Sequence, residues 1–236
     1  MILNRLTIAG ALLLSGCMVD VQTGPTRYES QAIDMDKAES VRVELHMGAG
    51  ELKIGSGTEK LMQAYFTYNV PSWKPVVNYS PSSGTAELKV EQPSGVHRGL
   101  NGRKYEWDLR FNDQKPLDLA VHFGAGQGQL DVGRLNLRSV EVHMGVGQMD
   151  LDLRGHPQSS YSVEVHGGIG QATVQLPSGV GVEAHAAGGI GHIEMRGLTS
   201  DGGGRWVNRE LGHSPITVRV NVNGGIGEIR LLGDTD

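Results

Sequence analysis

Histidine and glutamate recur at fixed positions in this sequence, where they could bind a metal ion or carry a proton. A histidine stands two residues before a Gly-x-Gly motif at four places, His46, His122, His143 and His166. A glutamate precedes three of these histidines by two residues, at Glu44, Glu141 and Glu164. Neutral imidazoles suit Zn²⁺ or Cu²⁺, and their ordinary pKa of about 6.5 suits a pH sensor. Two related motifs carry Ala187 and Asn223 instead, which favours a solvated polar face, so we expect no bound metal.

Carboxylates offer a second possible chemistry, because polysaccharide-cleaving enzymes use pairs of them in a groove. The candidates are Glu141, Asp150, Asp152 and Glu164. The two aspartates alternate along one strand-like segment, where charged side chains are expected to face solvent. No Gly-x-Ser-x-Gly nucleophile motif occurs. We therefore predict that the chain is not an enzyme and uses no cofactor.

The only cysteine, Cys17, directly follows a segment with the features of a secretory leader. Arg5 precedes an apolar run over residues 6–14, which is about half the roughly 20 residues that a membrane-spanning helix needs. Leu14-Ser15-Gly16-Cys17 resembles the lipobox of bacterial lipoproteins. We expect residues 1–16 to be a signal peptide and Cys17 to carry acyl chains that hold the protein on a membrane. Met18 after the cysteine points to the outer membrane, facing the periplasm.

The glycine motifs belong to a longer repeat, in which one strand of alternating polarity precedes each Gly-x-Gly and another follows it. Six copies span residues 41–55, 117–133, 140–155, 163–179, 182–197 and 218–233. Their glycine pairs are Gly48/Gly50, Gly124/Gly126, Gly145/Gly147, Gly168/Gly170, Gly189/Gly191 and Gly225/Gly227. Four consecutive pairs are 21, 23 and 21 residues apart, which is typical of the coils of a β-solenoid. The glycines would allow a positive φ or close stacking on the next coil where each coil turns.

An insert at residues 58–112 interrupts the repeat with aromatic, alternating segments. We expect it to form antiparallel strands that cap the first coils. Residues 17–38 lack periodicity and are predicted to be the lipidated cysteine with a tether. The remaining boundaries place an N-terminal part containing the insert at 39–116 and the glycine-motif coils at 117–236.

Several short segments, in a fixed order, resemble the bacterial toast-rack family. They are Phe66-Thr67-Tyr68-Asn69, Trp73-Lys74-Pro75, Tyr105-Glu106-Trp107-Asp108, and the Gly-Gly-Ile-Gly sequences at 188–191 and 224–227. Members are similar to the C-terminal β-helical domain of cell-wall-active antibiotic response proteins. The resemblance implies an all-β, short single-stranded β-solenoid with a role at the cell envelope, and it implies no catalytic residue.

Charge and the strand edges indicate the kind of partner. The net charge of −5 and the absence of a basic patch exclude nucleic acid. A strand, not a helix, follows each glycine pair, which excludes a dinucleotide site. We expect a lipid-anchored, non-catalytic binding or sensing module, with a possible part in envelope stress, or alternatively a structural or adhesive surface lipoprotein. The last coil, 218–232, ends close to the end of the chain, so its open edge is predicted to dock a partner strand or a second copy.

Overall fold

The computed structural model describes residues 23–93 and 102–234, and its regular structure is almost entirely β-strand. Within these residues, one 13-stranded sheet contains every strand. The elements are β1 Arg27–Ile33, β2 Ser40–Ser56, β3 Met62–Tyr68, the short 3₁₀ helix η1 Pro71–Trp73, β4 Val76–Ser80, β5 Thr85–Glu91, β6 Tyr105–Phe111, β7 Leu117–Asp131, β8 Leu137–Asp152, β9 Tyr161–Gln175, β10 Gly181–Arg196, β11 Thr199–Gly202, β12 Arg205–Val207 and β13 Thr217–Leu232. The predicted all-β class is confirmed.

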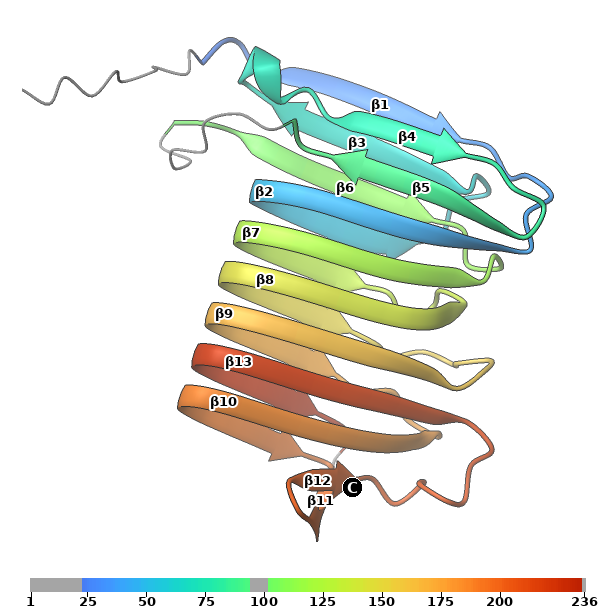
Figure 1. Ribbon diagram of the computed structural model, residues 1–236, viewed down its shortest axis with the longest axis vertical. Helices are drawn as coiled ribbons and strands as arrows, with labels where there is room; N and C mark the ends of the chain where they lie inside the picture. The colour runs from blue at the N-terminus through green and yellow to red at the C-terminus, as the bar shows by residue number, and fades with distance from the viewer. Residues whose placement is uncertain (1–22, 94–101, 235–236) are drawn as a thin grey trace, which may run out of the picture.

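Six strands are much longer than the rest, and each one bends back at its Gly-x-Gly motif (Figure 1). These strands are β2, β7, β8, β9, β10 and β13, of 15 to 17 residues each. The residues before the bend lie in one layer and the residues after it lie in a second layer, so one strand forms one coil. The molecule is therefore the single-stranded, toast-rack-like solenoid that the repeat predicts.

Neighbouring coils pair in parallel, with glycine opposite glycine. Gly147 of β8, for example, lies opposite Gly126 of β7 and Gly170 of β9. Because side chains alternate between the two faces of a strand, this register puts one apolar set on the inner face of every coil. We call the parts of a coil before and after its bend the first and second arms. Val142 and Leu151, from the two arms of β8, are almost fully buried. The core is the aliphatic layer between the two arms.

The order of the coils differs from their order in the sequence. The last strand, β13, lies between β9 and β10 and pairs with both of them along nearly its whole length. The prediction that the last coil forms an open edge is therefore wrong, and β10 is the terminal coil. The glycine register is the same between any two coils, so it does not specify which coil stacks on which. The long connection from β10 to β13, which holds β11 and β12, lets the chain return to the inner position.

The insert forms the cap at the other end of the solenoid, and part of it continues the parallel ladder. β5 pairs in parallel with the first arm of β2, and β6 pairs in parallel with its second arm. Together these two strands replace one coil. β4 and β3 then add to them in antiparallel fashion. The insert was expected to be wholly antiparallel, and that expectation is wrong for its contacts with β2.

Aromatic side chains fill the interior of this cap. The Phe66 and Trp107 rings meet edge to face, with centroids 5.7 Å apart, and Trp73 and Tyr105 do so at 5.5 Å. All four are buried. Edge-to-face contacts add stability beyond the area that they bury.

The predicted tether is shorter than expected. Residues 27–33 form β1, which pairs in antiparallel register with β3 at the outer edge of the cap. The segment alternates only weakly in polarity because it covers a sheet edge while most of its side chains stay in solvent. The signal peptide, Cys17 and residues 18–22 of the predicted tether lie outside the described residues.

Candidate functional site

The Gly-x-Gly bends require glycine for two different reasons. The second glycine of each pair has a positive φ, between +129° and +152°, which favours glycine over any residue with a side chain. The first glycine is instead constrained by its neighbour. A Cβ atom on Gly145 would lie 2.4 Å from the carbonyl oxygen of Gly124, and four other coils show the same close approach, at Gly124, Gly168, Gly189 and Gly225. The bends therefore stack with backbone directly against backbone.

Gly50, in the first coil, has another turn glycine beside it on one side only. It pairs with Gly126 of β7 on one side, as expected. On its other side lies the cap instead of a coil, and a Cβ atom on Gly50 would lie 2.4 Å from the carbonyl oxygen of Tyr105 in β6. Gly50 is consequently buried, whereas the second glycines of the other five pairs are partly or fully exposed. Gly50 therefore turns its coil as the other second glycines do, with the cap strand β6 in place of a second glycine neighbour.

Gln92, directly after the end of β5, supplies a hydrogen-bond acceptor to the backbone of the first bend. Its side-chain oxygen accepts hydrogen bonds from the backbone N–H groups of Gly48 and Ala49, at 2.7 and 3.2 Å. The side chain of Gln92 is buried. A buried N–H group without a partner is costly, so Gln92 seals the end of the bend stack where no further coil is present.

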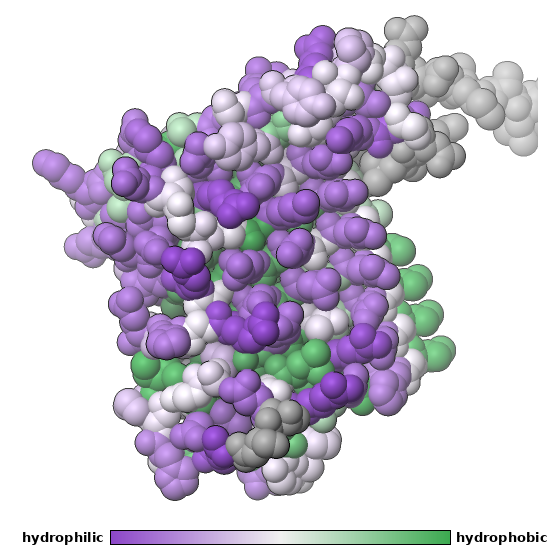
Figure 2. All heavy atoms as spheres, turned by 180° about the vertical axis from the view of Figure 1, so that it is seen from behind, coloured by the Kyte–Doolittle hydropathy of each residue, from purple (hydrophilic) through white to green (hydrophobic). Residues whose placement is uncertain are grey.

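The middle residue of each Gly-x-Gly points outward and forms what we call the aliphatic ridge. In spatial order its residues are Ala49, Ala125, Val146, Ile169, Ile226 and Ile190, each paired in register with the next. The last four have exposed fractions of 51, 51, 50 and 71%. Figure 2 shows a row of apolar side chains protruding along the bend edge beside polar rows. The side chains grow from alanine to isoleucine toward β10.

The predicted histidine column is present on the outer face of the first arms. His46, His122, His143 and His166 stack with ring centroids 4.6, 5.0 and 4.9 Å apart and planes within 15° of parallel. Parallel rings direct their nitrogen lone pairs side by side, whereas a tetrahedral metal site needs ligands that converge on one point. No group of three or more potential ligands suited to a metal ion occurs among the described residues.

One of the glutamates beside the column, Glu141, hydrogen-bonds to the histidine of its own strand. His143 Nε2 lies 2.6 Å from Glu141 Oε1, and this hydrogen bond holds the pKa of Glu141 below its usual value. Burial, together with the adjacent His46 and His143 rings, lowers the pKa of His122. Ala120 stands where β7 would supply a glutamate to His122. His122 therefore resists taking up a proton.

The carboxylates considered for catalysis lie on opposite sides of the molecule. Glu141 and Glu164 precede their bends and face out from the first layer, whereas Asp150 and Asp152 follow the bend of β8 and face out from the second. Asp152 is paired with Arg154 at 2.6 Å, and Glu164 accepts a hydrogen bond from Asn221 at 2.7 Å. These four carboxylates do not meet in one groove.

Comparison with known proteins agrees with this architecture. The family model described as the N-terminal domain of toast_rack, DUF2154, matches residues 22–175. The chain belongs to the toast-rack family. None of the curated proteins matches it. In the residues that the structure describes, no helix is long and apolar enough to cross a membrane.

Solved structures include a relative of this toast-rack protein over nearly its whole length. A putative cell adhesion protein from Clostridium sporogenes is 31% identical, with a TM-score of 0.83, and the match covers 89% of this chain and 100% of that one. A putative adhesin from Parabacteroides distasonis is 12% identical, with a TM-score of 0.28 over 87% of this chain and 97% of that one.

The aliphatic ridge is the feature that sequence reasoning missed. The middle residue of Gly-x-Gly reads as a spacer, and its outward direction depends on the bend. A signal was nevertheless present, because the residue changes from alanine to valine to isoleucine among motifs that are otherwise alike. Surface turns rarely select isoleucine, so the position is a candidate for contact with another molecule.

Proposed function

We propose that this toast-rack protein is a non-catalytic binding module of the bacterial cell envelope, and that it contacts a partner protein through the aliphatic ridge. The proposal depends above all on the ridge, whose Val146, Ile169, Ile226 and Ile190 are each at least half exposed. A contiguous apolar patch of this kind marks an interaction site. The parallel ladder also holds these side chains in place before binding, which reduces the entropic cost of association.

An adhesive setting is supported by the relative from Clostridium sporogenes, which is described as a putative cell adhesion protein. A sensing role in envelope stress would use the same ridge. A non-catalytic role is supported by the placement of Glu141 and Glu164 on the face opposite Asp150 and Asp152.

The membrane anchor in this proposal is a lipid on Cys17, in the outer membrane and facing the periplasm. The described chain enters the fold at the cap, where the N–H of Gly24 donates to the carbonyl of Asn69 at 2.7 Å. The isoleucines of the ridge lie on β9, β13 and β10, at the opposite end (Figure 1). An anchor at Cys17 would therefore direct the isoleucine end away from its own membrane. Polar Gln171 and Asn223 beside the ridge, in place of lysine or arginine, also favour a protein partner over anionic lipid.

Photo-crosslinking in native membranes tests the ridge. A photoreactive residue at Ile226 is expected to give a discrete protein adduct that disappears in the Ile169→Ser/Ile190→Ser variant. A photoreactive residue at Lys53, exposed on the outer face of the second layer, is the matched control and should give no such adduct. Adducts that are equal at both sites, or that survive the serine substitutions, would place the contact elsewhere.

The anchor is tested in the same cells. Cys17→Ala should move the protein out of the detergent phase on phase separation and abolish the Ile226 adduct by releasing the protein from its membrane. If the Cys17→Ala protein still enters the detergent phase, another segment is the anchor.

A further inference from the structure

The two ends of the solenoid are covered differently, although both end coils have the same two arms. At the cap end, β5 covers the first arm of β2 and β6 covers its second arm. At the other end, β12 pairs with Glu183, Ala184 and His185 and so covers the first arm of β10. Among the described residues, no strand covers the second arm of β10. The fold therefore leaves one half-coil uncovered.

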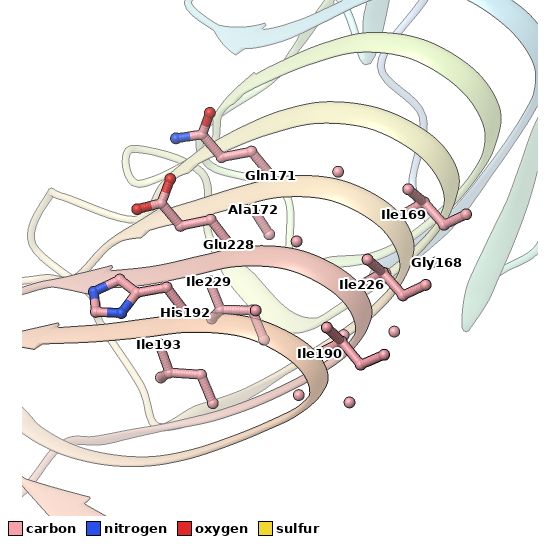
Figure 3. A pocket seen from close by; sticks show the side chains of 18 of the residues that line it. Gly168, Ile169, Gln171, Ala172, Ile190, His192, Ile193, Ile226, Glu228 and Ile229 are labelled. Atoms are coloured by element: carbon pink, nitrogen blue, oxygen red, sulfur yellow. The ribbon is translucent and has the colours of Figure 1, made fainter.

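The uncovered arm exposes apolar side chains that belong to the core layer. Through the continuous register of the coils, Ile193 corresponds to Leu52 of β2, and Met195 corresponds to Ile54. Beneath β6, Leu52 and Ile54 are 1 and 3% exposed, whereas without such cover Ile193 is 39% exposed and Met195 is half-buried. Figure 3 shows Ile193 in line with Ile229 on the inner side of the coils. The exposure of Ile193 therefore results from a missing neighbour strand and not from its direction.

The backbone of this arm also directs hydrogen-bonding groups to its open side. The N–H of Gly233 donates to the carbonyl of Arg196 at 2.9 Å, so the backbone groups of Arg196 face β13. In an extended strand, the backbone groups of successive residues face opposite neighbours. Those of Ile193 and Met195 therefore point away from β13, to a side where no strand of the described residues lies. An open edge of this kind is a template for a further strand.

A second copy of the solenoid cannot stack onto this arm. β12 and β11 lie beyond β10 in the sheet and occupy the next two strand positions beside its first arm (Figure 1). A complete coil would need those positions for its own first arm. The open position is thus limited to a single strand that runs beside residues 191–196.

The cap shows which kind of strand fits a second arm. β6 covers the second arm of β2 with Trp107, Leu109 and Phe111, which are almost fully buried in the core. The charged residues between them are partly or fully exposed. A strand on β10 would likewise place large apolar side chains over Ile193 and Met195, and the burial of this apolar surface would stabilise the contact.

We infer that the second arm of β10 binds one extended segment of a partner protein, in which large apolar residues alternate with polar ones. The segment adds to the sheet through main-chain hydrogen bonds to Ile193 and Met195, and its apolar side chains complete the core layer. This site goes beyond the ridge and does not depend on it. The ridge uses side chains on the outside of the bends, such as Ile190, whereas this site uses backbone groups and core-facing side chains (Figure 3).

The probe is a synthetic peptide with the sequence of β6, Tyr105–Phe111, because β6 already covers a second arm. The peptide carries a diazirine analogue of leucine at the position of Leu109 and is added to the full-length protein purified in detergent. After irradiation, mapping of the digested protein is expected to find the label on residues 192–196. Label on β2 would show that the peptide has displaced β6, and label on the ridge would show side-chain contact alone; either result would overturn the inference.

Two versions of the peptide, N-methylated on alternate residues, test the main-chain pairing on the wild-type protein. A strand directs only alternate N–H groups to its neighbour, so one version should bind about tenfold more weakly or worse, and the other should bind as the unmethylated peptide does. Equal affinities of the two versions would exclude strand addition.

A proline in the protein tests the same edge from the other side. Ile193→Pro removes an outward N–H without breaking a bond to β13, so it should weaken peptide binding about tenfold or more at an almost unchanged melting temperature. Ile169→Ser, on the ridge, is the matched control and should bind the peptide as the wild type does. Unchanged binding to folded Ile193→Pro protein, or an equal loss in Ile169→Ser, would overturn the inference. A wild-type dimer in sedimentation that Ile193→Pro dissociates would do so as well, because the occupant would then be a second copy.

Discussion

At the scale of single residues, the histidine column shows how one side chain acquires a pH-dependent role in stability. His122 has stacked imidazoles on both sides, 4.6 Å away at His46 and 5.0 Å away at His143. Its pKa is lowered first by burial and then by these two neighbours. Glu141 and Glu44 oppose that shift without cancelling it. The folded protein therefore resists protonation at His122 more than the unfolded chain does.

This shift predicts a loss of stability on mild acidification. As the pH falls through about 6.5, the unfolded chain takes up a proton at residue 122 before the folded protein does, so the free energy of unfolding decreases. The stabilisation from neutral His122 is complete above that pH, and it is lost as the pH falls through the lowered pKa of His122 in the folded protein. His122→Asn, the residue found at the equivalent position 223, should flatten the decrease between pH 7.5 and 5.5 in urea unfolding curves. Glu141, whose pKa is lowered, affects stability only at more acidic pH.

A histidine outside the column provides the control for this measurement. His156 is exposed in the loop between β8 and β9, and His156→Asn should keep the wild-type dependence on pH. An equal flattening in both variants would assign the effect to general charge and not to the stack.

The histidine column could be predicted from sequence because it needs only strand alternation and a common register. The equal spacing of the histidines from their glycines supplied both. The ridge could not be interpreted in the same way. Its meaning depends on the direction in which each side chain leaves a bent backbone, and on which residues of a neighbouring coil it meets.

At the scale of the element, each coil depends on a bend that only glycine accommodates. Gly147 combines a φ of +142° with a Cβ position 1.9 Å from the carbonyl oxygen of Gly126. Gly147→Ala should therefore lower the free energy of unfolding by at least about 2 kcal/mol, because backbone strain and a backbone clash add together. Chemical denaturation measures the change. Gly84→Ala, which meets nothing within 4 Å, should change the stability little. Similar losses in the two variants would show that the bend tolerates a side chain.

The long strands were well predicted at this scale, but the insert was not. Alternation and the glycine pairs identify all six coils, because each coil carries its own pattern. β5 and β6 carry ordinary alternation as well, and nothing in that pattern distinguishes a parallel partner from an antiparallel one. Their pairing with the two arms of β2, which also buries Gly50 against Tyr105, depends on contacts between residues far apart in the sequence. β1 was missed for a related reason, because an edge strand exposed to solvent needs little apolar periodicity.

At the scale of the whole molecule, the inserted position of β13 changes which strand can accept a partner. A solenoid stacked in sequence order would end in β13, whereas this one ends in β10. β12 covers only the first arm of β10, and in the described residues the outer side of its second arm pairs with no strand. We therefore propose that strand addition by a partner takes place at the second arm of β10.

Proline substitutions at adjacent positions distinguish these two arrangements. In an edge strand, alternate N–H groups point away from the sheet, so one of two neighbouring positions tolerates proline; in a strand paired on both sides, neither does. Val220→Pro and Asn221→Pro in β13 should each lower the free energy of unfolding by about 2 kcal/mol or more, because each leaves a ladder acceptor unpaired. In the second arm of β10, either Ile193→Pro or Glu194→Pro should melt close to the wild-type temperature. Tolerance of proline in β13, or its rejection at both positions in β10, would restore the sequential order of coils and move the accessible edge back to the last strand.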